Sequence, residues 1–317
     1  MSSDDVRRAR EAIAGRLHRT PTFSSVTLSQ RTGAEIFLKA ELFQRTGSFK
    51  PRGVLTNLAA LSGDEKRAGV IGISAGNHAQ ALAYGAALED VDCLVVMWRG
   101  ASEAKIAAAR GYGAAVDLEA TGPSEAFAQL TELREQSGRT LVHPFDSPLT
   151  IAGQGTVGLE IAEDVAAVGA IVVPIGGGGL VAGIATAVKD AATAPRVIGV
   201  EPELSTAMAS ALEAGHPVPV STASIADGLN APFAGDNTHP ICVRLLDGLV
   251  TVSEAEIRDG FRFLYERAKL ASEPAGAAAV AALLAGKIAI SPGERVVAVV
   301  SGGNVEGRIA SGILAGR

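Results

Sequence analysis

Cysteines and long apolar runs are scarce in this chain, and each shortage excludes a class of protein. Only two cysteines occur among 317 residues. Cys93 lies in an apolar run and Cys242 is isolated, so we expect both to be reduced residues of a cytoplasmic protein. No apolar run approaches the roughly 20 residues that span a bilayer. The chain begins with acidic and polar residues (Met1-Ser2-Ser3-Asp4-Asp5), which is not the pattern of a signal peptide.

Basic clusters and metal-ligand spacings are missing as well. The formal net charge is −6, and no basic stripe or arginine-rich helix occurs in the sequence. Nucleic acid is therefore not an expected partner, and neither is a membrane. The five histidines have no metal-ligand spacing and no cluster of cysteines and histidines occurs, so we expect no catalytic zinc.

The composition that remains is that of a soluble globular protein. Hydrophobic residues make up 47% of the chain and charged residues 20%. Thirty-seven glycines and only 4% aromatic residues are typical of an α/β protein with many tight turns between strands and helices. A chain of this length can form a large core and two lobes.

Short apolar runs alternate with alanine-rich helical stretches along most of the sequence. The first set has predicted strands at 70–73, 93–97, 115–118 and 140–142, with helices at 77–88, 103–110 and 124–136 between them. A second set has predicted strands at 170–175, 197–200 and 295–300, and the proline-containing segment 143–148 is the expected crossover. This βαβα pattern predicts α/β lobes, each with a mostly parallel sheet covered by helices on both faces.

Lys50 is the first candidate for chemistry. It lies in a turn between a strand-like run, 34–40, and a helix that Pro51 is suited to begin. A lysine at the positive end of a helix dipole is disfavoured as an ammonium, and the neutral amine can attack a carbonyl. The alternative is a solvated surface lysine, the commoner fate of this residue type.

Four consecutive glycines, Gly176, Gly177, Gly178 and Gly179, lie between a predicted strand and a predicted helix. Glycines allow close approach of the backbone to a ligand, and amides at a helix start bind anions, so the segment predicts a phosphate site. The same region also satisfies a dinucleotide-binding pattern through Gly177, Gly179 and Ala182, with Glu201 as the ribose-binding acid. A nicotinamide-dependent dehydrogenase is therefore an alternative.

Two further segments follow predicted strands. The match Gly72-Ile73-Ser74-Ala75-Gly76 has the spacing of a hydrolase nucleophile elbow, which would need Asp146 or Asp227 together with His239. We prefer the interpretation that residues 74–78 open a helix whose free amides hold a carboxylate. Ser301 follows the last predicted strand, where ligands of parallel sheets bind, although a polar turn residue is the alternative.

A lysine, a phosphate cradle, an anion-binding helix start and a serine at a strand end together indicate pyridoxal 5′-phosphate. At this point the chain resembles the serine/threonine dehydratase and serine racemase family, of the tryptophan-synthase-β fold (fold type II). The resemblance covers nearly the whole chain in the order of the family's motifs. The matching segments are 46–50, Ser74-Ala75-Gly76-Asn77-His78, Ala152-Gly153-Gln154-Gly155-Thr156, 176–179, Glu273-Pro274-Ala275-Gly276 and Ser301-Gly302-Gly303-Asn304.

The resemblance assigns a role to each candidate. It implies that Lys50 forms the Schiff base with pyridoxal phosphate and then acts as the base at Cα. The four glycines would bind the phosphate, Phe49 would flank the ring, Asn77 would hydrogen-bond its hydroxyl, and Ser301 would face its nitrogen. The substrate carboxylate would be wrapped by residues Ser74, Ala75, Gly76, Asn77 and His78.

The resemblance also implies an organisation and a reaction. It implies a homodimer whose large cofactor-binding domain (1–53 and 144–317) carries a small mobile domain (54–143) that closes over the substrate. A hydroxyl such as that of Ser301 cannot readily protonate a pyridine nitrogen, which favours loss of a β-substituent. We therefore expect an ammonia-lyase that removes the hydroxyl of L-threonine or L-serine and yields a 2-keto acid and ammonia.

Two positions depart from the racemase pattern. Racemases have a serine at the position of Ala75, which serves as the second acid/base, so efficient racemisation is not expected here. Their divalent-ion site uses the residue matching Glu201 and an acid six residues later, where this chain has Ala207, so Glu201 is at most a weak ligand and no metal requirement is expected. Because little sequence follows Ser301, we expect a catabolic-type enzyme without a regulatory domain. A racemase, a hydroxyaspartate-type dehydratase and a silent cofactor-binding protein stay as alternatives.

Overall fold

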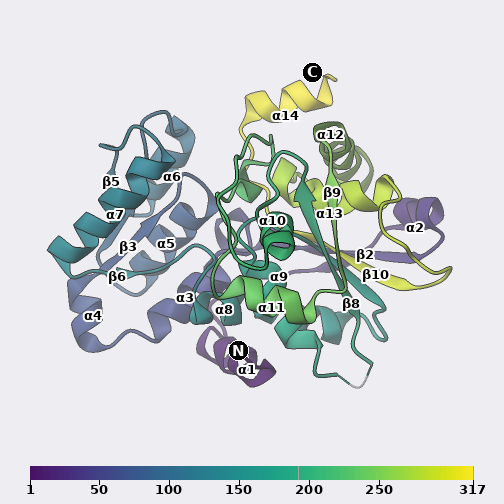
Figure 1. The fold of residues 1–317 in the computed structure, drawn as a ribbon, viewed down its shortest axis with the longest axis horizontal. Helices are drawn as coiled ribbons and strands as arrows, with labels where there is room; N and C mark the ends of the chain where they lie inside the picture. Colours follow the sequence, from purple (N-terminus) through teal and green to yellow (C-terminus); the bar gives the residue numbers. More distant parts are fainter. Residues whose placement is uncertain (192, 317) are drawn as a thin grey trace.

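A computed structural model describes residues 1–191 and 193–316. The described chain contains two sheets, each flanked by helices (Figure 1). Residues 192 and 317 of the expected large domain lie outside the described part. The α/β class predicted from the alternating pattern is confirmed.

The larger sheet, called here the large sheet, has six strands in the order β1-β2-β10-β7-β8-β9. Only β1 runs antiparallel to its neighbour, and the other pairs are parallel. The strand bounds are β1 (Thr22–Ser24), β2 (Glu35–Ala40), β7 (Ala170–Pro174), β8 (Arg196–Pro202), β9 (Gly248–Val252) and β10 (Arg295–Val300).

Alternate residues of the central strands enter two different cores. Val296, Ala298 and Val300 of β10 face a core built with α2 (Val26–Thr32), α12 (Glu254–Phe263) and α13 (Pro274–Leu284). Val297 and Val299 face the opposite core, which contains α8 (Pro148–Asp164), α9 (Gly179–Val188) and α11 (Thr238–Leu245). Burial on both faces explains why these strands are continuous apolar runs in the sequence.

The smaller sheet, called here the small sheet, is wholly parallel, in the order β5-β4-β3-β6. Its strands are β3 (Val70–Ile73), β4 (Cys93–Val96), β5 (Ala115–Asp117) and β6 (Thr140–Leu141). The helices α3 (Pro51–Ala59), α5 (Asn77–Leu88) and α6 (Glu103–Gly111) cover one face, and α7 (Pro123–Ser137) covers the other.

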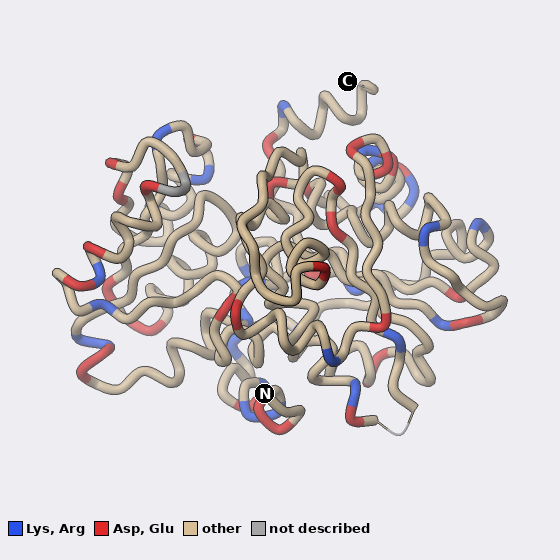
Figure 2. Tube along the Cα trace, in the orientation of Figure 1, with Lys and Arg blue, Asp and Glu red and all other residues tan. Residues whose placement is uncertain are grey.

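The remaining elements connect or border these layers. They are α1 (Ser3–Ala12), η1 (Glu41–Phe43), η2 (Arg45–Gly47), α4 (Gly63–Ala68), α10 (Ala207–Ala214), η3 (Asp227–Leu229), the π-helix η4 (Leu264–Ala268) and α14 (Gly307–Leu314). Lysine and arginine are interspersed with aspartate and glutamate along the trace (Figure 2). Among the described helices, none is both long and apolar enough to cross a bilayer.

Candidate active site

The predicted site residues lie after the carboxyl ends of neighbouring parallel strands. In the large sheet, β10 lies between β2 and β7. Lys50 follows β2, Ser301 follows β10, and the glycine cradle, Gly176–Gly179, follows β7. Since the carboxyl ends of parallel strands share one edge of a sheet, the topology brings these three segments to the same edge.

The segment before Lys50 pairs directly with the segment that contains Ser301. The amide of Phe49 donates to the carbonyl of Ser301 at 3.2 Å, and the amide of Gly303 donates to the carbonyl of Gly47 at 2.9 Å. Ser48 and Gly302 form an antiparallel bridge between these contacts. Backbone pairing thus holds Lys50 and Ser301 in adjacent segments although they lie far apart in the sequence.

Lys50 is the N-cap residue of α3, and Pro51 is the first residue of that helix. Its Nζ donates a 2.8 Å hydrogen bond to the carbonyl of Pro144 and lies 5.1 Å from the centre of the Phe49 ring. Part of the side chain remains exposed, but the protein around its end desolvates the ammonium and lowers the pKa of Lys50 to about 8. The charge of Glu273 opposes this shift. The surface-lysine alternative is not what the fold shows.

The glycine cradle forms the start of α9. Among the described hydrogen bonds, none has the amides of Gly176, Gly177, Gly178 or Gly179 as donors, and Leu180 and Val181 at the same helix start also donate to no protein acceptor. Gly178 has φ +95°, in the left-handed region that favours glycine. Unpaired amides at a helix start fit the phosphate of pyridoxal phosphate.

Protein atoms crowd the other side of the cradle. A Cβ on Gly178 would lie 2.6 Å from the Met208 side chain, and one on Gly179 would lie 2.7 Å from the carbonyl of Phe145. The carbonyl of Gly177 accepts from the hydroxyl of Thr238 at 2.7 Å. Only glycine therefore fits this turn without displacing its neighbours.

Residues 74–78 follow β3 at the carboxyl edge of the small sheet and include the first two residues of α5. The hydroxyl of Ser74 accepts from the amide of Gly76 at 3.0 Å. The amides of Ala75, Asn77 and His78 donate to no acceptor among the described residues. This helix start can bind a carboxylate, as the sequence suggests.

Asn77 joins this segment to the large sheet. Its Nδ2 donates to Glu273 at 2.7 Å, and its Oδ1 accepts from Nδ2 of Asn304 at 2.8 Å. These two contacts fix the orientation of the amide and leave one N–H of Asn77 for a ligand. Glu273 precedes α13, and its own amide donates to the carbonyl of Gly302 beside Ser301.

Burial alters the protonation of two groups here. Burial raises the pKa of Glu273 to about 8, and the charge of Asp227 adds to the effect. Burial, with the Lys50 charge adding to it, lowers the pKa of His78 to about 3. Its Nε2 lies 2.8 Å from the carbonyl of Val142, so the neutral ring carries its proton on Nε2 and presents Nδ1 as an acceptor.

The contacts of Glu201 do not match the ribose or metal roles. Its side chain is fully buried, and its two oxygens accept from the amides of Met208 and Ala209 at 2.7 and 2.9 Å. The carboxylate thereby caps α10, and burial raises its pKa to about 7. No group of three metal-ligating side chains occurs within the described residues.

The nucleophile-elbow alternative finds no triad in the described structure. Ser74 is engaged by Gly76, and the carboxylate of Asp146 accepts from the amides of Asp236 and Asn237. No described hydrogen bond joins His239 to any of them, and its Nε2 is buried without a partner. Ser74, Asp146 and His239 therefore do not form a relay.

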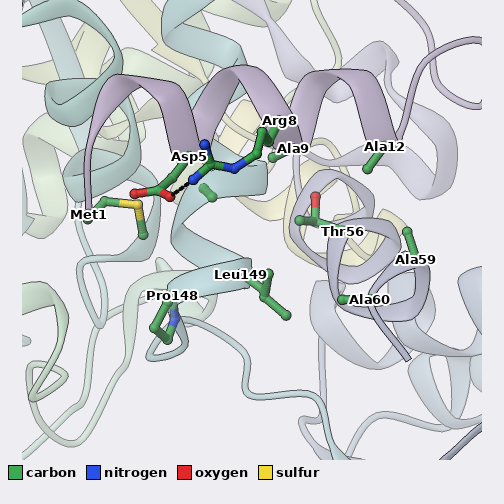
Figure 3. Close-up of a pocket in the computed structure, with 11 residues that line it drawn as sticks. Met1, Asp5, Arg8, Ala9, Ala12, Thr56, Ala59, Ala60, Pro148 and Leu149 are labelled. Atoms are coloured by element: carbon green, nitrogen blue, oxygen red, sulfur yellow. Dashed lines mark hydrogen bonds and ion pairs between the residues drawn. The ribbon is translucent and has the colours of Figure 1, made fainter. Parts of the chain in front are cut away.

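A cavity of about 280 Å³ lies elsewhere, between α1, α3 and the start of α8 (Figure 3). Its lining includes Asp5, Arg8 and Leu149 but none of the predicted site residues. Asp5 and Arg8 form an ion pair with each other. This cavity is separate from the chemistry described above.

Sequence reasoning did not single out every residue of the site. In the sequence, Glu273 and Asn304 stand out only as parts of matching segments, yet in the fold both bind Asn77. Lys105 of α6 forms an ion pair with Asp227 of η3, across the two sheets. No local pattern marks such pairs, because their partners lie in distant parts of the sequence.

Comparisons with known proteins agree with this geometry. The family described as "Pyridoxal-phosphate dependent enzyme" matches residues 13–302. The "L-threonine dehydratase catabolic TdcB" of Escherichia coli K12 is 43% identical over 305 residues, which are 96% of this chain and 93% of the relative.

Two solved structures are similar over nearly their whole length. Maize serine racemase has a TM-score of 0.93 at 35% identity, with 99% of this chain and 97% of that chain covered. A threonine deaminase from the organism abbreviated T.th. has a TM-score of 0.90 at 39% identity, with 96% of this chain and 99% of that chain covered.

Proposed function

The chain belongs to the family of pyridoxal-phosphate-dependent enzymes, and from this premise we propose that it is a lyase that deaminates L-threonine, and L-serine more weakly. The relative with 43% identity bears the name of a threonine dehydratase, and the similar structures include a threonine deaminase. The observation that carries the proposal is the convergence of Lys50, the glycine cradle and Ser301 at one edge of the large sheet.

Each site residue has a proposed part in holding the cofactor. Lys50 would carry it covalently, the amides of Gly176–Gly179 would bind its phosphate, and the free N–H of Asn77 would reach its ring hydroxyl. Phe49 would flank the ring and Ser301 would face its nitrogen. Bound pyridoxal phosphate supplies a ring that withdraws electrons from Cα of an attached amino acid.

The chain's own residues would then perform the elimination. The amides of residues 74–78 would hold the substrate carboxylate and so orient the Cα–H bond toward Lys50. Once displaced by the substrate's amino group, the neutral amine of Lys50 would be free to take the Cα proton. Lys50 would pass this proton to the β-hydroxyl, which would leave as water as the Cβ–O bond breaks. The product released after loss of water has a C=N bond in its imine form. Hydrolysis of this bond would consume a water and give ammonia and 2-oxobutanoate.

Product analysis tests this proposal. Protein loaded with pyridoxal phosphate and given L-threonine should release ammonia and 2-oxobutanoate in equal amounts. L-Serine should give pyruvate more slowly. A coloured protein that yields no keto acid from threonine, serine or 3-hydroxyaspartate would instead support a silent binding protein. A colourless protein that binds NAD would support the dehydrogenase alternative.

A racemase is the second candidate because of the similarity to maize serine racemase. Ala75, beside the proposed carboxylate site, has a methyl group that cannot carry a proton, so we propose that elimination exceeds racemisation. The assay compares D-serine with pyruvate formed from L-serine. Ala75→Ser should raise the D-serine share, and an unchanged share would contradict this account.

Organisation and location are proposals of the same kind. The two sheets support a small mobile domain, 54–143, that closes on a large domain, 1–53 and 144–317. The resemblance to the dehydratase family supports a homodimer. The low cysteine content supports a cytoplasmic location, and the capping role of Glu201 supports activity without a divalent cation.

A further inference from the structure

Arg52 is a fully buried guanidinium two residues after Lys50. Its side chain is 2% exposed, and it lies in the first turn of α3. A buried arginine is rare unless it is paired, so the surroundings of Arg52 require an explanation.

Two carboxylates from two different elements bind Arg52. Nε and Nη2 donate to the two oxygens of Glu41 at 2.8 Å each, and Glu41 follows β2 directly. Nη1 and Nη2 donate to the two oxygens of Glu160 on α8, at 2.6 and 2.9 Å. Two bidentate pairs fix the plane of the guanidinium as well as its position.

Further contacts complete the network. Thr156 of α8 accepts from Nη1 at 3.0 Å, and Lys39 of β2, with no exposed surface, lies 2.7 Å from Glu160. Burial of such a network is costly, and apolar residues of similar volume often stabilise a fold as well or better. The network therefore points to a need for accurate placement of α3 more than to stability.

The helix whose side chains bind Arg52, α8, also packs closely against α9, the helix that begins at the glycine cradle. A Cβ on Gly153 of α8 would lie 2.5 Å from the carbonyl of Arg52, so α3 and α8 are in backbone contact. A Cβ on Gly155 of α8 would lie 2.7 Å from the carbonyl of Gly183 on α9. Figure 1 shows α3, α8 and α9 next to one another, and we call them the three-helix slab.

Both ends of the predicted cofactor site begin helices of this slab. Lys50 caps α3 and Gly178 caps α9, with α8 packed against both helices. We propose that Arg52 is a positioning residue that locks α3 to α8 and so sets the distance between Lys50 and the glycine cradle. The proposal rests on the proposed roles of Lys50 and the cradle.

The consequence is selective for covalent attachment. Phosphate binding needs only the cradle, whereas attachment needs the Lys50 amine to reach the aldehyde carbon of a cofactor whose phosphate is already fixed. In that step a C=N bond forms and the aldehyde oxygen leaves as water. A displacement of Lys50 by about 1 Å can lower the rate of this attachment by roughly a hundredfold while leaving the anion site intact.

The test uses cofactor-free protein and two ligands, without any amino acid. Pyridoxine 5′-phosphate, which lacks the aldehyde, reports the cradle alone, and pyridoxal 5′-phosphate reports cradle and Lys50 together. Arg52→Lys keeps the charge but cannot form bidentate pairs with both carboxylates in one plane. Its matched control is Arg19→Lys, which alters an exposed arginine that binds Glu163 and Asp164, the last two residues of α8.

The expected result is a split between the two ligands. Arg52→Lys should bind pyridoxine 5′-phosphate within about twofold of the parent but should attach pyridoxal 5′-phosphate covalently about tenfold or more slowly. Arg19→Lys should bind both ligands as the parent does. Parallel loss of both ligands, or no change in either, would overturn the proposal.

A second variant covers the case in which Arg52→Lys does not fold. Glu160→Gln keeps the volume of the side chain and the Arg52–Glu41 pair, and it is judged by the same two ligands. Unchanged covalent attachment in a folded Glu160→Gln protein would overturn the proposal, and so would a parallel loss. Because no substrate is used, a protein that fails to act on threonine would leave this result unaffected.

Discussion

Lys105, in α6 beside the small sheet, forms an ion pair with Asp227, in η3 beside the large sheet. The pair lies close enough to Glu273 for both charges to act on that carboxyl. A second contact crosses the same divide, since the rings of Phe127 in α7 and Phe233 lie 5.9 Å apart. These contacts hold the small sheet and its helices against the loops that border the site.

We therefore expect Lys105→Met and Asp227→Asn to raise KM for L-threonine by about three- to tenfold, because the proposed closure over the substrate would weaken. Stability should change by less than about 1 kcal/mol, since Asp227 is half exposed. The double variant should match the single ones in kcat/KM. Arg99→Met, which breaks an exposed pair with Glu119 within the small lobe, is the control. Fully additive effects of the two single changes would contradict the pairing.

The pKa of Lys50 determines how the rate at which the cofactor-free protein attaches pyridoxal phosphate depends on pH. Because burial lowers this pKa to about 8, the fraction of Lys50 in the neutral amine form should rise as the pH increases through that value. The rate of covalent attachment of pyridoxal phosphate, measured from about pH 6 to about pH 9.5, should rise and then level off above about 8. A lysine peptide in solution, with a pKa near about 10.4, should show a rate that rises over the whole range. A profile for the protein that parallels the peptide would contradict the desolvation of Lys50.

Glu273 should cost the cofactor-free fold stability at high pH. Its pKa is about 8 in the fold against 4.5 when exposed, so the folded state binds more protons between these values. The free energy of unfolding therefore falls as the pH rises through this window. Glu273→Gln removes the titration and keeps an oxygen for Asn77, so it should stabilise by about 1 kcal/mol or more at about pH 9 and by little at about pH 5. Urea unfolding at the two pH values measures this, and a gain that is equal at both would show that Glu273 does not titrate in this range.

Gly178→Ala should disable the cradle. The φ of +95° and the side chains of Met208 and Thr238 leave no room for a methyl group. We expect a loss of about tenfold or more in affinity for pyridoxine 5′-phosphate and about 1 kcal/mol or more in stability. Gly312→Ala, in the interior of α14 with nothing within 4 Å of the added Cβ, is the control and should leave binding intact. Equal affinity of the two variants for pyridoxine 5′-phosphate would contradict the assignment of the glycine cradle as the phosphate site.

From apolar runs the sequence predicted β2, β3, β4, β5, β6, β7, β8 and β10, but it did not predict β9, whose residues are mostly half-buried. It did not predict α8, whose residues Gly153, Gly155 and Gly158 have poor helix propensity. In the fold these glycines allow backbone contact with α3 and α9, which outweighs propensity. The three-residue strand β1 is also too short to give a periodic signal.

The residues of the site also fall into two groups, those that the sequence marks locally and those that it does not. Lys50, the glycine cradle and Ser301 are each marked by local composition after a strand, so they could be proposed from sequence. Arg52, Glu273 and Lys105 acquire their surroundings only through contacts with distant elements. A buried charge carries no local signature, because its partners are fixed by packing between helices and sheets.

The central claim is that Lys50 is the residue that carries the cofactor above a phosphate cradle. Its most direct test is borohydride reduction of the protein with pyridoxal phosphate, followed by peptide mapping by mass spectrometry. The account predicts that the cofactor is fixed on the peptide containing Lys50 and that Lys50→Ala loses both this label and the visible absorbance band. Specific labelling of another lysine, or an unlabelled Lys50 in a protein that still forms 2-oxobutanoate, would contradict it.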